Sequence, residues 1–181
     1  MRNVILIILT IFSFCLKAQE YPLNTSPSDI PDNAYLKDMN NELDKYVGTW
    51  KGVRDGKTYE FNFIKKENVG ENIKWDKLLG RLKITTASGI LEYDNFNKTD
   101  SELELKFFGD NFQKDLKAYL LYFSGDQINC IDYGYTYLRI QSETPNNMSI
   151  LFLPLYDITT DNCSNFKTTL PSEKLIHLTK Q

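Results

Sequence analysis

Residues 57–65 read Lys-Thr-Tyr-Glu-Phe-Asn-Phe-Ile-Lys, and they place Tyr59, Phe61 and Phe63 on one side of an extended chain. The residues between these aromatic side chains are polar. Because successive side chains of a strand point to opposite faces of its sheet, this alternation predicts a half-buried β-strand.

Similar strand patterns continue to the end of the chain, and turn residues such as Asp55-Gly56 and Ser124-Gly125-Asp126 separate many of them. We expect further strands over residues 47–53, 73–86, 89–93, 101–107, 118–124, 127–133, 135–141, 149–156 and 174–179. An open sheet of this size would leave an apolar face and two edges exposed. The pattern therefore predicts an all-β fold, an antiparallel meander of 8 to 10 strands closed into a barrel, with a β-sandwich as the alternative. The side chains expected to point inward are Phe61, Phe63, Leu103, Leu105, Phe107, Leu151 and Leu153.

The N-terminal part of the chain divides into three segments. Residues 1–18 combine Arg2, an apolar run and Lys17-Ala18, which is typical of a secretory signal peptide. The apolar run is too short to span a bilayer, which needs about 20 apolar residues. Residues 19–33 form a polar, Pro-containing leader, and residues 34–181 are expected to form one domain. The spacing of apolar residues over 34–46 predicts one short helix at its start.

The composition excludes several function classes. The 21 Lys and Arg residues are balanced by 24 Asp and Glu residues, for a net charge of −3, so no basic surface is available for nucleic acid. The chain has one His and three Cys, and it contains no motif typical of a nucleophilic enzyme, a nucleotide site or a metal site. We therefore expect no catalytic residues, no cofactor, no metal and no membrane span after cleavage.

Export also determines which cysteines remain in the protein and whether they are oxidised. Cys130 and Cys163 remain after removal of the signal peptide, and an even pair in an oxidising compartment predicts a disulfide. Two buried free thiols are the alternative, since sequence alone does not show that the side chains meet.

The run Leu43-Asp44-Lys45-Tyr46-Val47-Gly48-Thr49-Trp50 resembles the opening of calycins, the lipocalins and fatty-acid-binding proteins. The resemblance implies that Gly48 and Trp50 lie on the first barrel strand and that the indole plugs one end. The chain as a whole resembles an uncharacterised family of small exported proteins from Bacteroidota, through Leu16-Lys17-Ala18-Gln19, the leader and residues 41–50. That resemblance implies a single exported β-rich domain in the periplasm or outside the cell, and no activity.

Two functions remain open, and neither is enzymatic. The first is a lipocalin-like carrier that holds a small apolar or amphipathic ligand inside the barrel. The second is a filled barrel or sandwich that acts through its exterior on another envelope or extracellular protein, as an inhibitor or an adhesion module. Tyr133, Tyr135 and Tyr137 alternate on one strand face and can either line a ligand, sugar or protein site or stabilise the sheet by packing across strands.

Overall fold

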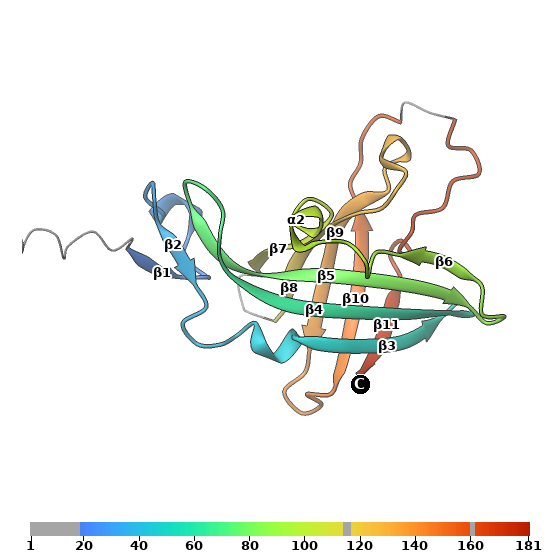
Figure 1. Ribbon diagram of the computed structural model, residues 1–181, viewed down its shortest axis with the longest axis horizontal. Helices are drawn as coiled ribbons and strands as arrows, with labels where there is room; N and C mark the ends of the chain where they lie inside the picture. Colours follow the sequence, from blue (N-terminus) through green and yellow to red (C-terminus); the bar gives the residue numbers. More distant parts are fainter. Residues whose placement is uncertain (1–18, 114–116, 160–161) are drawn as a thin grey trace, which may run out of the picture.

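The computed structural model describes residues 19–113, 117–159 and 162–181, so the expected signal peptide lies outside the described residues. Eight antiparallel strands close into a barrel, which confirms the predicted fold (Figure 1). They are β3 (Gly48–Arg54), β4 (Lys57–Val69), β5 (Lys74–Thr86), β7 (Phe107–Phe112), β8 (Tyr119–Ser124), β9 (Tyr133–Ile140), β10 (Asn147–Pro154) and β11 (Leu175–Lys180).

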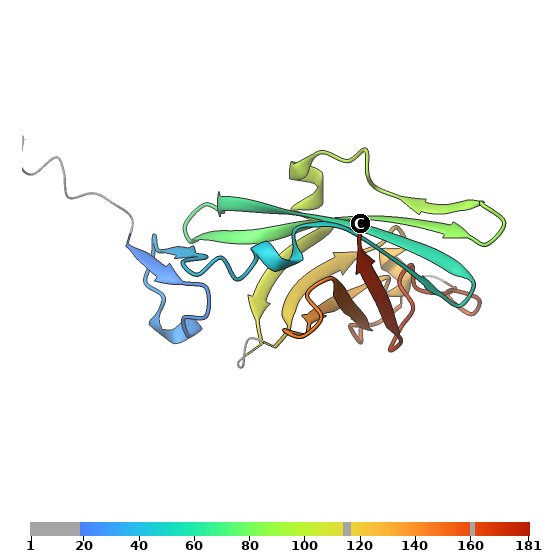
Figure 2. The same cartoon turned by 90° about the horizontal axis from the view of Figure 1, so that it is seen from below.

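The barrel order is β5-β4-β3-β11-β10-β9-β8-β7, and β7 returns to β5. Two short stretches of strand pairing close the barrel into a ring. β3 meets β11 at Trp50–Lys180 and Lys51–Thr179, and β5 meets β7 at one pair, Leu79–Phe108. The long β4–β5 hairpin forms one side of the barrel, and β8 to β11 form the other (Figure 2).

Three further strands extend the sheet beyond the ring. The leader contributes β1 (Glu20–Pro22), which pairs in parallel with β2 (Tyr35–Lys37), and β2 pairs in parallel with β5. β6 (Leu91–Asp94) pairs with the other end of β5. These strands lie at the edges of the barrel, and they depart from a simple antiparallel meander.

A buried aspartate holds the segment after β2 against the barrel. The Asp38 carboxylate accepts hydrogen bonds from the backbone N–H groups of Glu42 and Leu43 at 2.7 and 3.0 Å, and it pairs with Lys65 at 2.8 Å. Its side chain is only 1% exposed. The helix expected over residues 34–46 is accordingly reduced to one 3-10 turn, η2 (Asp44–Tyr46), because β2 and this Asp38-centred turn occupy the rest.

The prediction of a strand over residues 101–107 is wrong. The segment begins with the short helix α2 (Asp100–Leu103), in which the Thr99 side chain accepts the Glu102 N–H while the Glu102 carboxylate accepts the Thr99 N–H. This capping box satisfies free backbone groups at a helix start, which an alternating pattern does not reveal. Leu103, the last residue of α2, is buried. Leu105 was expected to point into the barrel, but it is 77% exposed.

The prediction of which β10 side chains point into the barrel is also wrong. Ile150 and Phe152 point into the core, whereas Leu151 and Leu153 are partly exposed on the outside. Residues 127–133 form no complete strand either, because the 3-10 helix η3 (Ile128–Cys130) occupies their centre. Strand β5 continues through Gly80 without interruption. A Cβ at that position would lie 2.5 Å from Cδ1 of Phe107, so glycine makes room for the ring.

Candidate functional site

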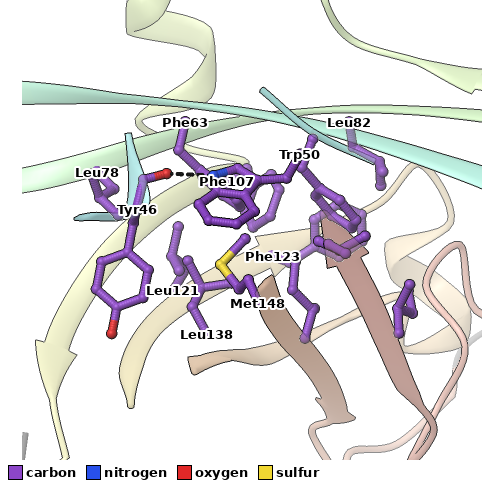
Figure 3. Close-up of a cluster of buried hydrophobic side chains, with 14 of the residues drawn as sticks. Tyr46, Trp50, Phe63, Leu78, Leu82, Phe107, Leu121, Phe123, Leu138 and Met148 are labelled. Carbon is purple, nitrogen blue, oxygen red and sulfur yellow. Dashed lines mark hydrogen bonds between the residues drawn. The ribbon is translucent and has the colours of Figure 1, made fainter. Parts of the chain in front are cut away.

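The barrel interior is filled by side chains. Trp50 is fully buried, and its Nε1 donates a hydrogen bond of 2.7 Å to the carbonyl oxygen of Tyr46 (Figure 3). Phe107 and Phe123 pack edge to face with ring centroids 5.1 Å apart. The core also contains Tyr59, Phe61, Phe63, Leu78, Leu82, Ile84, Phe112, Tyr119, Leu121, Leu138, Met148, Ile150, Phe152, Leu170, Ile176 and Leu178. This packing favours a filled barrel over a central ligand chamber.

The Gly48 and Trp50 pair lies where the barrel closes. Gly48 has φ = +122°, a conformation that side-chain-bearing residues rarely adopt. The Lys180 ammonium lies 5.2 Å from the centroid of the Trp50 ring, on the strand that completes the barrel. The first and last barrel strands therefore meet around the indole.

The tyrosine row lies on the outside of the barrel. Along β9, Gly134, Thr136 and Leu138 are buried, while Tyr133, Tyr135 and Tyr137 are partly exposed. Neighbouring strands extend this row, because Tyr122 lies opposite Tyr135, and Phe108 lies opposite Tyr122. We call the resulting surface the aromatic face; its members are Phe108, Leu120, Tyr122, Tyr133, Tyr135, Tyr137, Leu151 and Leu153.

Rings of the aromatic face pack against one another. The Tyr122 centroid lies 5.4 Å from that of Phe108, 6.5 Å from that of Tyr133 and 6.3 Å from that of Tyr135. At its edge, the Tyr133 hydroxyl donates a hydrogen bond of 2.7 Å to Asp157, which lowers the pKa of that carboxyl below its usual range. All eight members are aromatic or aliphatic, so the face carries apolar area and tyrosine hydroxyls without a charge of its own.

A second surface feature is a cleft of about 710 Å³ at one end of the barrel. Its walls come from the β3–β4 turn, the end of β10 and the segment leading into β11. Tyr59, Ile131 and Phe166 supply apolar lining, and Lys57, Lys167 and Lys174 supply positive charge. Sequence reasoning missed this site, because its residues lie on separate turns and loops and share no periodicity.

The predicted disulfide is present beside this cleft, with the Cα atoms of Cys130 and Cys163 5.6 Å apart. Asp132 adds a second connection, since its carboxylate accepts hydrogen bonds from the Thr169 N–H at 2.8 Å and the Thr169 hydroxyl at 2.7 Å. Two distant segments are thus joined at the same lip of the cleft.

Among the described residues, no group of three or more His, Cys, Asp and Glu side chains is arranged to hold a metal ion. His177 is exposed on β11. Within the same residues, no helix has the length and apolar character required to cross a membrane.

These features define a closed eight-stranded β-barrel protein with a filled interior, an outer aromatic face and a cleft at one end. The chain belongs to the family of unknown function DUF6705, whose match covers residues 1–136. Comparison with curated proteins and with solved structures gives no match. The family match ends within β9, so the β10 and β11 sides of the cleft lie beyond it.

Proposed function

We propose that this protein is an exported, non-enzymatic module that binds a neutral polysaccharide through its aromatic face. The observation that carries the proposal is the register of β7 to β10, which aligns aromatic and aliphatic side chains across the outside of a filled barrel. Of the two functions that the sequence left open, this proposal keeps action through the exterior of a filled barrel, but it replaces the protein partner by a sugar, which was one interpretation of the tyrosine row. The filled core argues against the carrier, because a ligand inside would have to displace side chains that already pack together.

Export is supported by the cysteine chemistry. A disulfide between Cys130 and Cys163 persists in oxidising compartments and is rare in the reducing cytosol. The apolar run of residues 4–16, followed by Lys17-Ala18, supports the same inference. A periplasmic or extracellular location would place the aromatic face among envelope and environmental glycans.

The chemistry of the aromatic face suits a sugar. A pyranose ring presents an apolar C–H face surrounded by hydroxyl groups, and a tyrosine offers an apolar ring with a polar tip. Tyr122, Tyr135 and Tyr137 provide such rings on adjacent strands, and the Asp157 carboxylate lies at the edge as an acceptor. The members of the face carry no charge. Two charged groups that border it, Lys77 at 5.5 Å from the Phe108 ring centroid and Asp157 beside Tyr133, are of opposite sign, which favours a neutral polymer over a charged one.

The size of the face also favours a glycan chain over a protein. The face covers five residues of β9, three residues each of β8 and β10 and one residue of β7. At about 3.3 Å per residue and about 4.8 Å between strands this gives roughly 200 Å². A stable protein–protein interface needs about 800 Å² per partner. The aromatic face alone is therefore too small for a tight protein complex.

The test measures depletion of the oxidised protein, lacking residues 1–18, from suspensions of neutral insoluble polysaccharides such as cellulose, chitin and xylan. We expect the wild type to bind at least one of them. Tyr135→Ala and Tyr122→Ala should each weaken binding about two- to tenfold, which corresponds to about 0.5 to 1.5 kcal/mol per stacked ring. Tyr156→Ala is the matched control, because Tyr156 is 93% exposed and lies outside the aromatic face.

Two results would count against the proposal. Binding that is equally weakened by Tyr135→Ala and by the Tyr156→Ala control would remove the aromatic face from the argument, and so would failure to bind any neutral glycan on the panel. Release of reducing sugar during the incubation would instead contradict the non-enzymatic assignment. Circular dichroism of each variant checks that the barrel is intact.

A further inference from the structure

The cleft at the barrel end lies where two neighbouring strands separate. β3 and β11 are paired only at Trp50–Lys180 and Lys51–Thr179, and they diverge toward the β3–β4 turn. An ion pair of 2.8 Å between Asp55 and Lys174 connects the two sides across this gap. The Lys174 ammonium holds the pKa of the Asp55 carboxyl below its usual range. The cleft is therefore a consequence of barrel geometry and lies outside the packed core.

Apolar side chains cover much of the cleft wall. Tyr59 lies at its base and is 3% exposed, so it belongs to the packed core and gives the cleft a fixed floor. Ile131, Leu155 and Phe166 approach from three other segments. A volume of about 710 Å³ matches small-molecule sites, which span about 300–1,000 Å³ and are mostly apolar with a few polar groups.

The charge of the cleft is opposite to that of the protein. Among the described residues that line it, Lys57, Lys167 and Lys174 are countered by Asp55. From the rim, Glu92 pairs with Lys57 at 2.6 Å, which leaves a net charge of +1 centred on Lys167, and that lysine is exposed on the lip. The whole chain carries −3. A local positive site on an acidic protein attracts a small anion in preference to a cation.

The lip of the cleft is held in an unfavourable backbone conformation. Ile131 adopts φ = 61° and ψ = 47°, the left-handed region that a β-branched residue rarely occupies. Such a conformation persists only where the surroundings fix it, and it occurs preferentially at ligand sites. Here the adjacent disulfide and the Asp132–Thr169 hydrogen bonds provide that constraint.

We propose that this cleft binds a small amphipathic anion. The apolar part of the ligand lies against Ile131, Leu155 and Phe166, and its anionic group faces Lys167. Both apolar lining and positive charge are required by this arrangement, so a neutral analogue of the same size binds less tightly. The site is separate from the aromatic face, and its existence does not depend on polysaccharide binding.

The test uses two fluorescent probes that share their aromatic rings and differ in charge. 1-Anilinonaphthalene-8-sulfonate carries a sulfonate, and N-phenyl-1-naphthylamine carries none. We expect the sulfonate probe to bind the folded, oxidised protein at one site, at least fivefold more tightly than the neutral probe. Raising the salt concentration should reduce this preference, since screening weakens the attraction between exposed charges.

Variants locate the site. Lys167→Gln should weaken binding of the sulfonate probe several-fold and leave the neutral probe unchanged. Leu155→Glu should weaken both probes, because it adds a carboxylate and removes apolar surface at a position already 37% exposed. Lys98→Gln is the matched control, since Lys98 is an exposed lysine paired with Glu102 beside α2. Tyr135→Ala tests separation from the aromatic face and should have no effect.

The proposal is overturned if the neutral probe binds as tightly as the sulfonate, if Lys167→Gln and Lys98→Gln behave alike, or if neither probe binds the folded protein. Loss of sulfonate binding in Tyr135→Ala alone would move the site to the aromatic face and would equally overturn it. Thermal unfolding of every variant distinguishes loss of the site from loss of the fold.

Discussion

Replacement of Trp50 by alanine tests how the barrel is closed. Truncation of a buried aromatic side chain costs about 3 to 5 kcal/mol. The Tyr46 carbonyl also loses the hydrogen bond that the indole donates at 2.7 Å, and a buried acceptor left unpaired costs about 1 to 3 kcal/mol. Since the two contributions overlap, we expect a loss of about 4 to 6 kcal/mol, which is comparable with the whole stability of a small domain.

The assay is urea unfolding of the oxidised protein, followed by far-ultraviolet circular dichroism at 25 °C. Trp50→Phe is the intermediate change, because it keeps a buried ring, removes the donor and leaves a smaller cavity than alanine; its expected cost is about 2 to 4 kcal/mol. It also provides a measurable value if the alanine variant does not fold. Trp75→Ala is the control, since Trp75 is only partly buried on β5. A loss below about 1 kcal/mol for Trp50→Ala would refute the reasoning, because core truncations of this size cost several times more.

Three further predictions concern individual contacts. In the protein lacking residues 1–18, reduction of the Cys130–Cys163 disulfide should lower the free energy of unfolding by about 3.5 to 4 kcal/mol in the chain-entropy treatment, measured as a shift in urea midpoint. A thiol count on the same protein before reduction should give none. Hydrogen bonds from the backbone of Thr99 lower the pKa of Glu102 from 4.5 to about 2. The stabilisation by that carboxylate is therefore complete above its unfolded value and is lost as the pH falls toward 2, so the difference in Tm between wild type and Glu102→Gln should disappear over that range; a constant difference would contradict it. Asp38→Ala should cost about 2 to 4 kcal/mol, measured by urea unfolding, because the N–H groups of Glu42 and Leu43 lose their acceptor, while Lys65 keeps its ion pair with Asp44 at 2.9 Å; a cost no larger than that of an exposed ion pair would contradict this role.

Periodicity identified the strands but not always the faces. The alternation over residues 57–65 predicted the first part of β4 correctly, since a half-buried strand shows which side is apolar. Both faces of β10 carry apolar residues, so the sequence does not indicate whether Ile150 or Leu151 points into the core. The register with β9 and β11 decides it, and register is a property of the assembled sheet.

Local hydrogen bonds explain the other differences. The alternation over residues 101–107 is overridden by the Thr99–Glu102 capping box, although the Thr-x-x-Glu spacing that signals it is visible in the sequence. The tyrosine row lies along β9, and the residues beside it come from β7, β8 and β10, which the sequence of one strand does not reveal. The cleft was not predictable in this way, because only the closed barrel brings its segments together.

The ladder between β3 and β11 sets the order in which the barrel can close. Lys51 pairs with Thr179, so β3 is completed by a strand that lies far from it in the sequence. Until β11 has folded onto it, β3 remains an unprotected edge able to pair with other chains. Ring closure is therefore a late step of folding, and the intermediate that precedes it is the form most exposed to edge-to-edge aggregation.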